Sequence, residues 1–352
     1  MASRFLAAAC HVSPITLSAA KTTEKCISLI NQAAKNSANL VVFPESYIPA
    51  FPVWSAIQAP TQNHVAFERM VKESIFVDGE EMHAIRDAAK QTGTVVSVGI
   101  SEKVRYSTAT MFNSNIIIDS DGEILVHHRK LMPTFFEKLT WSPGDGHGLR
   151  VANTRFGKLG ALICGENTNP LARYALMAQG EQIHISTWPS VWPTVVQTGR
   201  EIAGRRPNYD NIAANRTRAA AHCFENKCFG ILCAGHLDEA TIEVLTSLAD
   251  KPRYMNHNLI QSSRAFTMFL DPTGAALPGH TINPESGEKT ETEFLQREEG
   301  ILYAQLDLEK CVEGKQYHDV VGGYQRLDVF DLRVDRTRRK PATFFRKSKS
   351  GP

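Results

Sequence analysis

Short apolar runs alternate with amphipathic segments along most of this chain. The runs at 40–45, 94–101, 159–164, 181–187 and 228–235 are rich in β-branched and aromatic residues, which indicates buried strands. Apolar residues at helical spacing predict helices at about 20–36, 82–89, 169–180 and 208–223. Two more strands are expected, one within 263–277 and one near 300–310. The polar stretches 238–262 and 278–298 are predicted to form surface loops or short helices.

The stretch 113–128 predicts a hairpin, because Asp121-Gly122 suits a tight turn between two apolar runs. Hairpins mixed with helical crossovers favour a mixed-sheet α/β or α+β fold over a purely parallel one. No break in composition divides the chain before about residue 310. We therefore expect one catalytic domain at 1–310 and a separate C-terminal tail at 311–352.

Composition narrows the function classes without choosing one. The chain has 352 residues, 42% hydrophobic and 22% charged, with a formal net charge of +2. Such a balance is typical of a globular protein and gives no overall field that would attract nucleic acid or a membrane surface. The end of the chain differs, because residues 326–352 hold nine Lys or Arg against three Asp or Glu. This basic tail is interpreted as a solvated terminus, with an interaction arm as the alternative.

Seven cysteines are scattered along the chain without any C-x-x-C pair of the kind that binds metals. An odd, scattered set predicts reduced thiols and hence a cytoplasmic protein. The N-terminal apolar run is too short for a signal peptide, and no apolar stretch approaches the roughly 18 residues of a membrane span. No membrane association is expected.

Candidate chemistry lies where three predicted strands end. Glu45 closes "VVFPE", Lys130 follows "EILVHHR" and Cys164 closes "GALIC". Singly, the cysteine suits a small core side chain, the glutamate a helix cap and the lysine a solvated cation. Jointly they supply a nucleophile, a base to deprotonate it and a cation to stabilise the negative charge of an adduct. We therefore expect folding to bring these three groups together.

Three motifs in order give the chain a family resemblance. "VVFPES", "HRKLMPTFFEKLTWSPGDG" and "GALICGENTNPLARYALMAQGEQIHISTWP" resemble the nitrilase branch of the carbon–nitrogen hydrolase superfamily, and the likeness covers about residues 4–310. The resemblance implies a four-layer α-β-β-α sandwich with two mixed β-sheets. It implies a Glu-Lys-Cys triad of Glu45, Lys130 and Cys164, with Glu137 as an additional catalytic glutamate. No metal and no other cofactor is implied.

The same resemblance places the substrate pocket beside two strand ends. Trp188 and Pro189 follow one strand, and Tyr47 follows another. Gly165 and Trp54 complete the predicted pocket, and each aromatic side chain has ordinary core packing as its alternative. An apolar pocket of this kind predicts a neutral organic nitrile as substrate. Further possible walls are Phe135, Trp141 and Trp192.

The chain departs from the family pattern at two places. Many nitrilases have tryptophan directly after the catalytic cysteine, whereas this chain has Gly165. The tail motif is "GGYQRLD", with Gly323 and Leu327 where the family often has histidine and proline. The first departure affects the shape of the pocket. Related enzymes assemble through dimers into spirals, so we expect homo-oligomers, with helical filaments left open.

The histidines offer weaker candidates. His127 and His128 are adjacent on a strand, so they face opposite ways and cannot share a metal ion. His184 is predicted to be a core histidine with satisfied hydrogen bonds. His222 would imitate a Cys-His hydrolase only if it met Cys164, and no motif places them together. The glycosylation sequon at 215–217 has no role in a cytoplasmic protein.

The leading hypothesis is a nitrilase that forms a thioimidate and then a thioester on Cys164 and releases a carboxylic acid and ammonia. An amidase or carbamoylase of the same superfamily would use the same triad. A side reaction would end at the amide if the intermediate expelled the thiol instead of ammonia. A catalytically silent assembly protein is the alternative from another class.

Overall fold

The computed structural model describes residues 3–193 and 210–344, which form two β-sheets with helices outside them. The first sheet has the strand order β13-β12-β15-β1-β2-β3-β4-β5. Its strands are β1 (Arg4–His11), β2 (Leu40–Val42), β3 (Val95–Lys103), β4 (Met111–Ile118), β5 (Ile124–Arg129), β12 (Gly279–Ile282), β13 (Lys289–Thr292) and β15 (Gly300–Asp307).

The second sheet has the order β11-β10-β9-β8-β7-β6, and a short strand, β14, pairs with β10. Its strands are β6 (Ala152–Thr154), β7 (Gly157–Ile163), β8 (Ile183–Trp188), β9 (Phe229–Ala234), β10 (Thr267–Leu270), β11 (Ala276–Leu277) and β14 (Phe294–Leu295). The helices are α1 (Ala19–Lys35), α2 (Trp54–Ile57), α3 (His64–Glu73), α4 (Glu80–Thr92), α5 (Pro170–Met177), α6 (Asn211–Asn226), α7 (Glu239–Ser247), α8 (Pro252–Gln261) and α9 (Lys310–Glu313).

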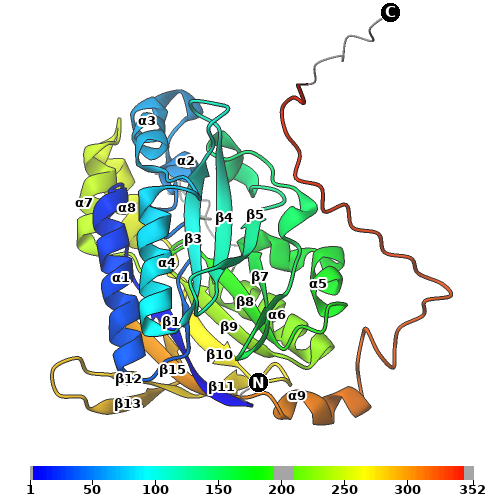
Figure 1. The fold of residues 1–352 in the computed structure, drawn as a ribbon. Coiled ribbons are helices and arrows are strands. Elements are labelled where there is room, and N and C mark those ends of the chain that lie inside the picture. Colours follow the sequence, from blue (N-terminus) through cyan, green and yellow to red (C-terminus); the bar gives the residue numbers. More distant parts are fainter. Residues whose placement is uncertain (1–2, 194–209, 345–352) are drawn as a thin grey trace, which may run out of the picture.

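The two sheets face one another, and helices cover their outer faces (Figure 1). Along β1 the side chains alternate, so that Ala7 and Ala9 point into the core between the sheets while Ala8 and Cys10 point toward α1 and α4. On the other side, Leu232 of β9 packs toward α6, and α5 lies beside that helix. Apolar side chains therefore fill three interfaces, which makes the α-β-β-α sandwich that was expected.

Most predicted elements are confirmed, with small shifts in their ends. The predicted helix at 208–223 is α6, which ends at Asn226; positions 208–209 lie outside the described residues. Of the two polar insertions, 238–262 forms the short helices α7 and α8 as expected. The prediction for 278–298 was wrong, because this stretch forms β12, β13 and β14. Its polar residues suit a pair of strands at an exposed sheet edge.

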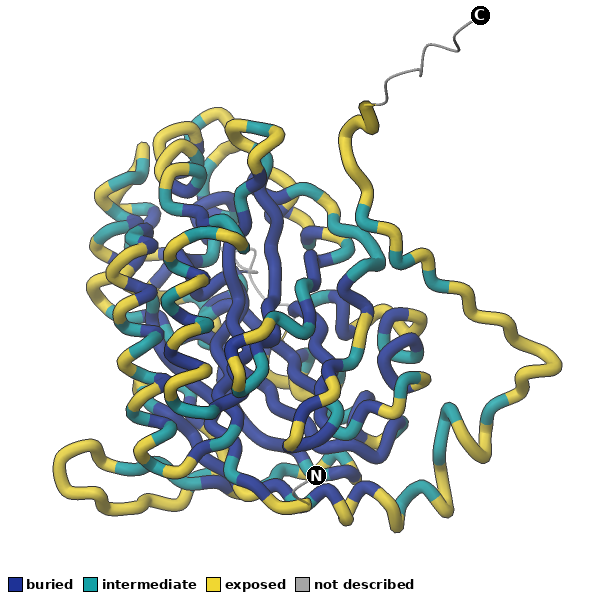
Figure 2. The backbone as a smooth tube through the Cα atoms, in the orientation of Figure 1, coloured by how far each residue is buried: buried dark blue, intermediate teal, exposed yellow. Residues whose placement is uncertain are grey.

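After α9, the described chain up to residue 344 leaves the body of the protein as an extended, mostly exposed segment (Figure 2). The structure places most residues from 317 to 344 at the surface. One segment returns to the body, where Arg338 pairs with Asp145 at 3.2 Å and donates to the backbone oxygen of His127 at 2.9 Å. Among the described helices, none is long and apolar enough to cross a membrane.

Candidate active site

Three strand ends from both sheets converge on one buried point. Glu45 follows β2, Lys130 follows β5, and Cys164 follows β7. The Nζ atom of Lys130 lies 2.7 Å from Oε1 of Glu45. Ligand atoms of Glu45, Glu137 and Cys164 all lie within 4.8 Å of one another. The structure thus brings together the sulfur, the carboxylate and the ammonium that the sequence placed at separate strand ends.

Glu137 completes this group from a short 3-10 turn, Phe135–Leu139. Both of its carboxylate oxygens accept hydrogen bonds from Lys130, at 2.9 and 2.7 Å. Its Oε2 atom also accepts from the backbone N–H of Thr134 at 3.0 Å, which fixes the carboxylate at the start of the turn. We call these residues the reactive cluster: Glu45, Lys130, Glu137 and Cys164.

Burial sets the protonation of the reactive cluster. Burial raises the pKa of the Glu45 carboxyl to about 7, although the Lys130 ammonium opposes this effect. Burial and the neighbouring Glu45 charge raise the pKa of the Cys164 thiol well above its usual value. For Lys130, burial alone would lower the pKa, but its three acidic neighbours outweigh burial and raise it. The resting cluster therefore holds a thiol, an ammonium and a glutamate poised to accept a proton.

One direct partner of the base was not predicted, because no sequence pattern points to it. The side-chain amide of Asn113, on β4, donates to Oε1 of Glu45 at 2.7 Å. That oxygen therefore receives hydrogen bonds from both Asn113 and Lys130. Among the described residues, Oε2 of Glu45 has no hydrogen-bond partner. One carboxylate oxygen is thus held in place while the other remains available for a proton.

Glu166, two residues after the cysteine, connects two strand ends through hydrogen bonds. Its Oε2 atom accepts from the backbone N–H of Ile163 at 2.8 Å, and its Oε1 atom accepts from Leu131 at 2.6 Å. The ring of His128 contacts the same carboxylate at 2.9 Å. Glu166 therefore ties the loop that carries Lys130 to the strand that carries Cys164, across 35 residues of sequence.

The cysteine and the following glycine adopt a tight turn. Cys164 has a φ of +50°, a left-handed conformation that residues other than glycine adopt rarely. A Cβ atom at Gly165 would lie 2.7 Å from Oγ1 of Thr134, too close for an unstrained contact. A larger residue after the nucleophile would require Thr134 to move, which is a physical reason for glycine at this position.

Cys164 borders a cavity of about 240 Å³. Three predicted pocket residues, Gly165, Trp188 and Pro189, line it, and so does Trp192. Two others lie elsewhere: the Tyr47 ring contacts Phe43 with centroids 5.2 Å apart, and Trp54, the first residue of α2, is buried in the core. Phe135 is 81% exposed, and Trp141 is in the core.

One wall of the cavity carries polar side chains that the sequence analysis did not assign to the pocket. One side of α6 contributes Asn211, Asn215 and Arg218, at spacings of four and three residues. The guanidinium of Arg218 lies over the Trp188 ring at 5.2 Å from its centroid. This helical periodicity was visible in "NIAANRTR", but only the fold shows that this side of the helix meets Cys164. These polar groups occupy one wall of a cavity whose lining surface is mainly apolar.

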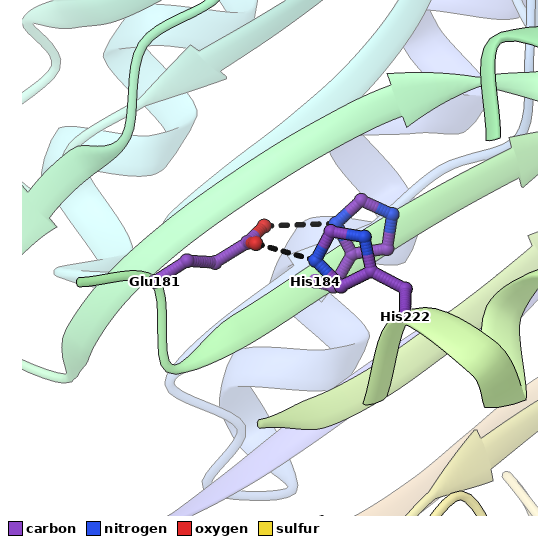
Figure 3. Close-up of side chains that lie close together, drawn as sticks. All are labelled: Glu181, His184 and His222. Carbon is purple, nitrogen blue, oxygen red and sulfur yellow. Dashed lines mark hydrogen bonds and ion pairs between the residues drawn. The ribbon is translucent and has the colours of Figure 1, made fainter. Parts of the chain in front are cut away.

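Each of the four candidate histidines has a carboxylate partner away from Cys164. His127 contacts Glu102 at 2.8 Å and His128 contacts Glu166, so the two rings do not share a site. His184 is buried with both ring nitrogens in hydrogen bonds, to Glu181 and Asn167. His222 also contacts Glu181, at 2.6 Å, which gives it a partner other than Cys164 (Figure 3).

Comparisons with known proteins agree with this geometry. The carbon-nitrogen hydrolase family matches residues 6–316. A nitrilase of Penicillium rubens is 32% identical, covering 97% of this chain and 96% of its own. An arylacetonitrilase of Hypocrea virens is 33% identical over 92% and 89% of the two chains. A bromoxynil-specific nitrilase of Klebsiella pneumoniae subsp. ozaenae is 34% identical over 97% and 88%.

Solved structures share the fold at lower identity. A carbon-nitrogen hydrolase from Helicobacter pylori G27 gives a TM-score of 0.63 at 21% identity, covering 89% of this chain and 92% of its own. Nit3 of Saccharomyces cerevisiae gives 0.61 at 19% identity, covering 93% and 97%. The chain belongs to the carbon–nitrogen hydrolase family, in its nitrilase branch, and is a hydrolase of carbon–nitrogen bonds of the nitrilase type.

Proposed function

We propose that Cys164 is the nucleophile that converts an organic nitrile to its carboxylic acid and ammonia. The observation that carries this proposal is that its sulfur lies within 4.8 Å of two carboxylates that share one buried ammonium. A thiol needs a nearby base to become a thiolate, and here the base is Glu45. The cavity beside the sulfur gives the substrate access to it.

The reaction proceeds in balanced steps. Glu45 takes the thiol proton as the sulfur bonds to the nitrile carbon, and the nitrile nitrogen takes a proton to give a thioimidate. A first water adds to the thioimidate carbon, the carbon–nitrogen bond breaks, and ammonia leaves a thioester. A second water adds to the thioester, the carbon–sulfur bond breaks, and the acid departs with the thiol restored. Two waters are consumed for each nitrile.

Lys130 and Glu137 support these steps in different ways. The Lys130 ammonium stabilises the negative charge that develops when the thiolate or water adds to carbon. Glu137 holds Lys130 through both carboxylate oxygens and so fixes its position. Lys130 is thereby directed by two acids, and its charge is already in place before substrate arrives.

The cavity favours a nitrile with a compact organic group. Trp188 and Trp192 offer apolar faces, and Asn211, Asn215 and Arg218 offer polar contacts at the same wall. Relatives named as an arylacetonitrilase and a bromoxynil-specific nitrilase support aryl or arylacetic nitriles as the first to test. An amidase reaction by the same residues is the second candidate, since an amidase from Nesterenkonia sp. shares the fold with a TM-score of 0.57.

The test is turnover of aliphatic, aryl and arylacetic nitriles, cyanide and matched amides, with ammonia, acid and amide each measured. We expect acid and ammonia from a nitrile, and loss of at least about 10⁴-fold in Cys164→Ala. Cys233→Ala, at another buried thiol, is the matched control and retains activity. Turnover of amides alone would select the amidase. No turnover in any protein would select the silent assembly protein.

We also propose that the chain is a cytoplasmic homo-oligomer with a catalytic unit at 1–310 and a tail at 311–352 that makes contacts between subunits. Most of the described tail is exposed (Figure 2), and apolar side chains are among its exposed residues, which supports a protein partner. Reduced, unpaired cysteines support the compartment. The exposed apolar residues of the described tail are Val312, Tyr317, Tyr324, Leu327, Val329, Phe330, Leu332 and Phe344.

The tail is tested by particle mass in solution, measured by sedimentation. The double change Leu327→Asp and Phe330→Asp places charge on two side chains that are 76% and 75% exposed. We expect the mass to fall to that of a smaller assembly. Gln325→Asp adds a charge nearby and serves as the control. An unchanged mass in the double variant would remove the tail from the subunit contacts.

A further inference from the structure

A second buried group of ionisable side chains brings together one glutamate and two histidines (Figure 3). Glu181 comes from the loop before β8, His184 from β8 and His222 from α6. Oε1 of Glu181 lies 2.8 Å from Nδ1 of His184, and Oε2 lies 2.6 Å from Nε2 of His222. All three side chains are almost completely buried. We call these three residues the histidine cluster.

The geometry of this cluster suits hydrogen bonds and not a metal ion. The two imidazole rings are stacked, with centroids 3.5 Å apart and planes 14° from parallel. A metal ion lies near the plane of each histidine ring that binds it, in the direction of the nitrogen lone pair. The lone pairs lie in the ring planes, and the planes of the two stacked rings are nearly parallel. The lone pairs of the two rings therefore do not meet at one point. Each ring instead meets its own carboxylate oxygen, which is the arrangement of two hydrogen bonds.

Asn167 connects the histidine cluster to the nucleophile. It lies in the 3-10 turn Cys164–Thr168 and is 1% exposed. Its Nδ2 atom donates to the backbone oxygens of Leu162 at 3.2 Å and Cys164 at 3.0 Å. Its Oδ1 atom lies 2.8 Å from Nε2 of His184 and accepts from Ser186 at 3.1 Å. The amide therefore holds the backbone on both sides of Ile163.

Counting donors and acceptors fixes the protons. Two carbonyl oxygens can only accept, so the NH₂ group of Asn167 must face them and Oδ1 must face His184. Nε2 of His184 must then carry a proton, because the oxygen opposite can only accept. Nδ1 of the same ring faces a carboxylate. His184 thus needs a proton on both nitrogens, paired with the negative charge of Glu181.

The remaining charges of the cluster fit this count. Burial would raise the pKa of Glu181, but the two neighbouring imidazoles outweigh it and lower the pKa to about 2. Burial lowers the pKa of His222 to about 4, so its ring is neutral near pH 7 and donates one proton to Glu181. The cluster then contains one negative and one positive charge, which is the balanced arrangement that burial demands.

We propose that Glu181, His184 and Asn167 form a positioning chain that holds the backbone turn of Cys164, with His184 as a doubly protonated imidazolium. Cys164 has a φ of +50°, so the turn must be held by its surroundings. The chain acts through Asn167 on the backbone and does not touch the substrate. Its catalytic consequence rests on the proposed role of Cys164, whereas its proton count does not.

Gly160 of β7 supports this arrangement from the neighbouring strand. A Cβ atom at that position would overlap Oε1 of Glu181. The carboxylate therefore fits only because Gly160 of β7 has no side chain. Gly160→Ala is expected to displace Glu181 without altering any residue of the reactive cluster, which makes it a third way to disturb the chain.

The first test reads the protons directly. Nitrogen-15 spectra of labelled histidine, recorded on the intact assembly at pH 7.5 and assigned with His184→Gln, distinguish protonated from bare ring nitrogens. We expect two protonated nitrogens for His184 and one for His222. A bare nitrogen on His184 would overturn the proposal. This measurement does not depend on activity. It therefore tests the protonation of His184 whether or not the proposed function is correct.

The second test reads the position of the thiol. In His184→Gln we expect kcat to fall about 10- to 100-fold with KM changed less than about threefold, because a misplaced nucleophile affects chemistry more than binding. The rate of Cys164 alkylation by iodoacetamide is expected to change in the same variant. His222→Gln, which shares Glu181 but not Asn167, is the matched control and should lose at most about threefold in kcat. Equal losses in the two variants, tracking equal losses in thermal stability, would reduce the cluster to a structural role and overturn the proposal.

Discussion

The reactive cluster and the histidine cluster are both buried groups of charged side chains, but their glutamates differ in how many carboxylate oxygens accept hydrogen bonds. In the histidine cluster both oxygens of Glu181 accept hydrogen bonds from histidine. In the reactive cluster Oε2 of Glu45 has no hydrogen-bond partner among the described residues, and the neighbouring thiol borders a cavity. Within the described part of the chain, the unpaired atom of the histidine cluster is Nδ1 of His222, which lies on a ring and not on the carboxylate. The comparison teaches that a carboxylate hydrogen-bonded through both oxygens holds a structure in place, whereas a carboxylate with one free oxygen beside a nucleophile is prepared for proton transfer.

The largest effect is expected from removing the cation shared by the reactive cluster. Lys130→Met leaves two carboxylates buried without a counter-charge, so we expect turnover to fall at least about 10³-fold. The free energy of unfolding should fall by about 3–5 kcal/mol for the same reason. Lys138→Met, at an exposed position of the same short turn, is the control. Full stability in Lys130→Met, measured by urea unfolding, would contradict the buried charge network.

The pH dependence of activity tests the available carboxylate oxygen. Burial raises the pKa of Glu45 to about 7, and the base acts as a carboxylate. Activity should therefore rise with pH up to about 7 and fall about tenfold per unit below it, or roughly 100-fold at pH 5. The measurement is kcat/KM between pH 5 and 9. A flat profile down to pH 5 would show that Glu45 is not the proton acceptor.

A pair of glycines tests the packing around the two clusters. Gly165→Ala places a methyl group 2.7 Å from Oγ1 of Thr134, so we expect kcat to fall about tenfold. Adding Thr134→Ala removes the conflicting atom, and a double-mutant cycle should show recovery. Additive losses in kcat would mean that the two residues do not meet. Gly160→Ala is the matched change beside the histidine cluster.

The smallest expected effect on activity near neutral pH comes from changing Glu181. Its charge affects the stability of the fold in acid instead. The pKa of Glu181 is lowered from 4.5 to about 2, so its charge stabilises the fold above pH 4.5 and this contribution is lost as pH falls toward 2. We expect a loss on the order of 2 kcal/mol across that window. The slope of unfolding free energy against pH should be shallower in Glu181→Gln. Glu45 is expected to act oppositely, because its raised pKa makes ionisation destabilising as pH rises from 4.5 to about 7.

Local patterns predicted much of the fold because strands and helices leave periodic signals within about ten residues. They failed at β1, whose run "RFLAAACH" is rich in alanine, a weak strand former, although it lies at the centre of the first sheet. They also failed at 278–298, where exposed strands carry polar residues on both faces. In both places the strand is stabilised by its neighbours in the sheet, which lie far away in sequence.

The candidate site divides in the same way. Glu45, Lys130, Glu137 and Cys164 were found from strand ends and motif resemblance. Asn113, Thr134 and Arg218 were not, because nothing in a single sequence indicates that an asparagine or arginine faces a distant cysteine. Their contacts in the folded protein reveal them.

The sequence by itself determined the alternation of strands and helices, the family, and which side chains stand at the ends of buried strands. Only the tertiary structure decided that four of them share one buried point, that α6 supplies a polar wall, and that Asn167 links a buried histidine to the nucleophile. The reason is physical: periodicity and turn chemistry act between near neighbours in the chain, whereas proton positions and cavities depend on which distant strands pair.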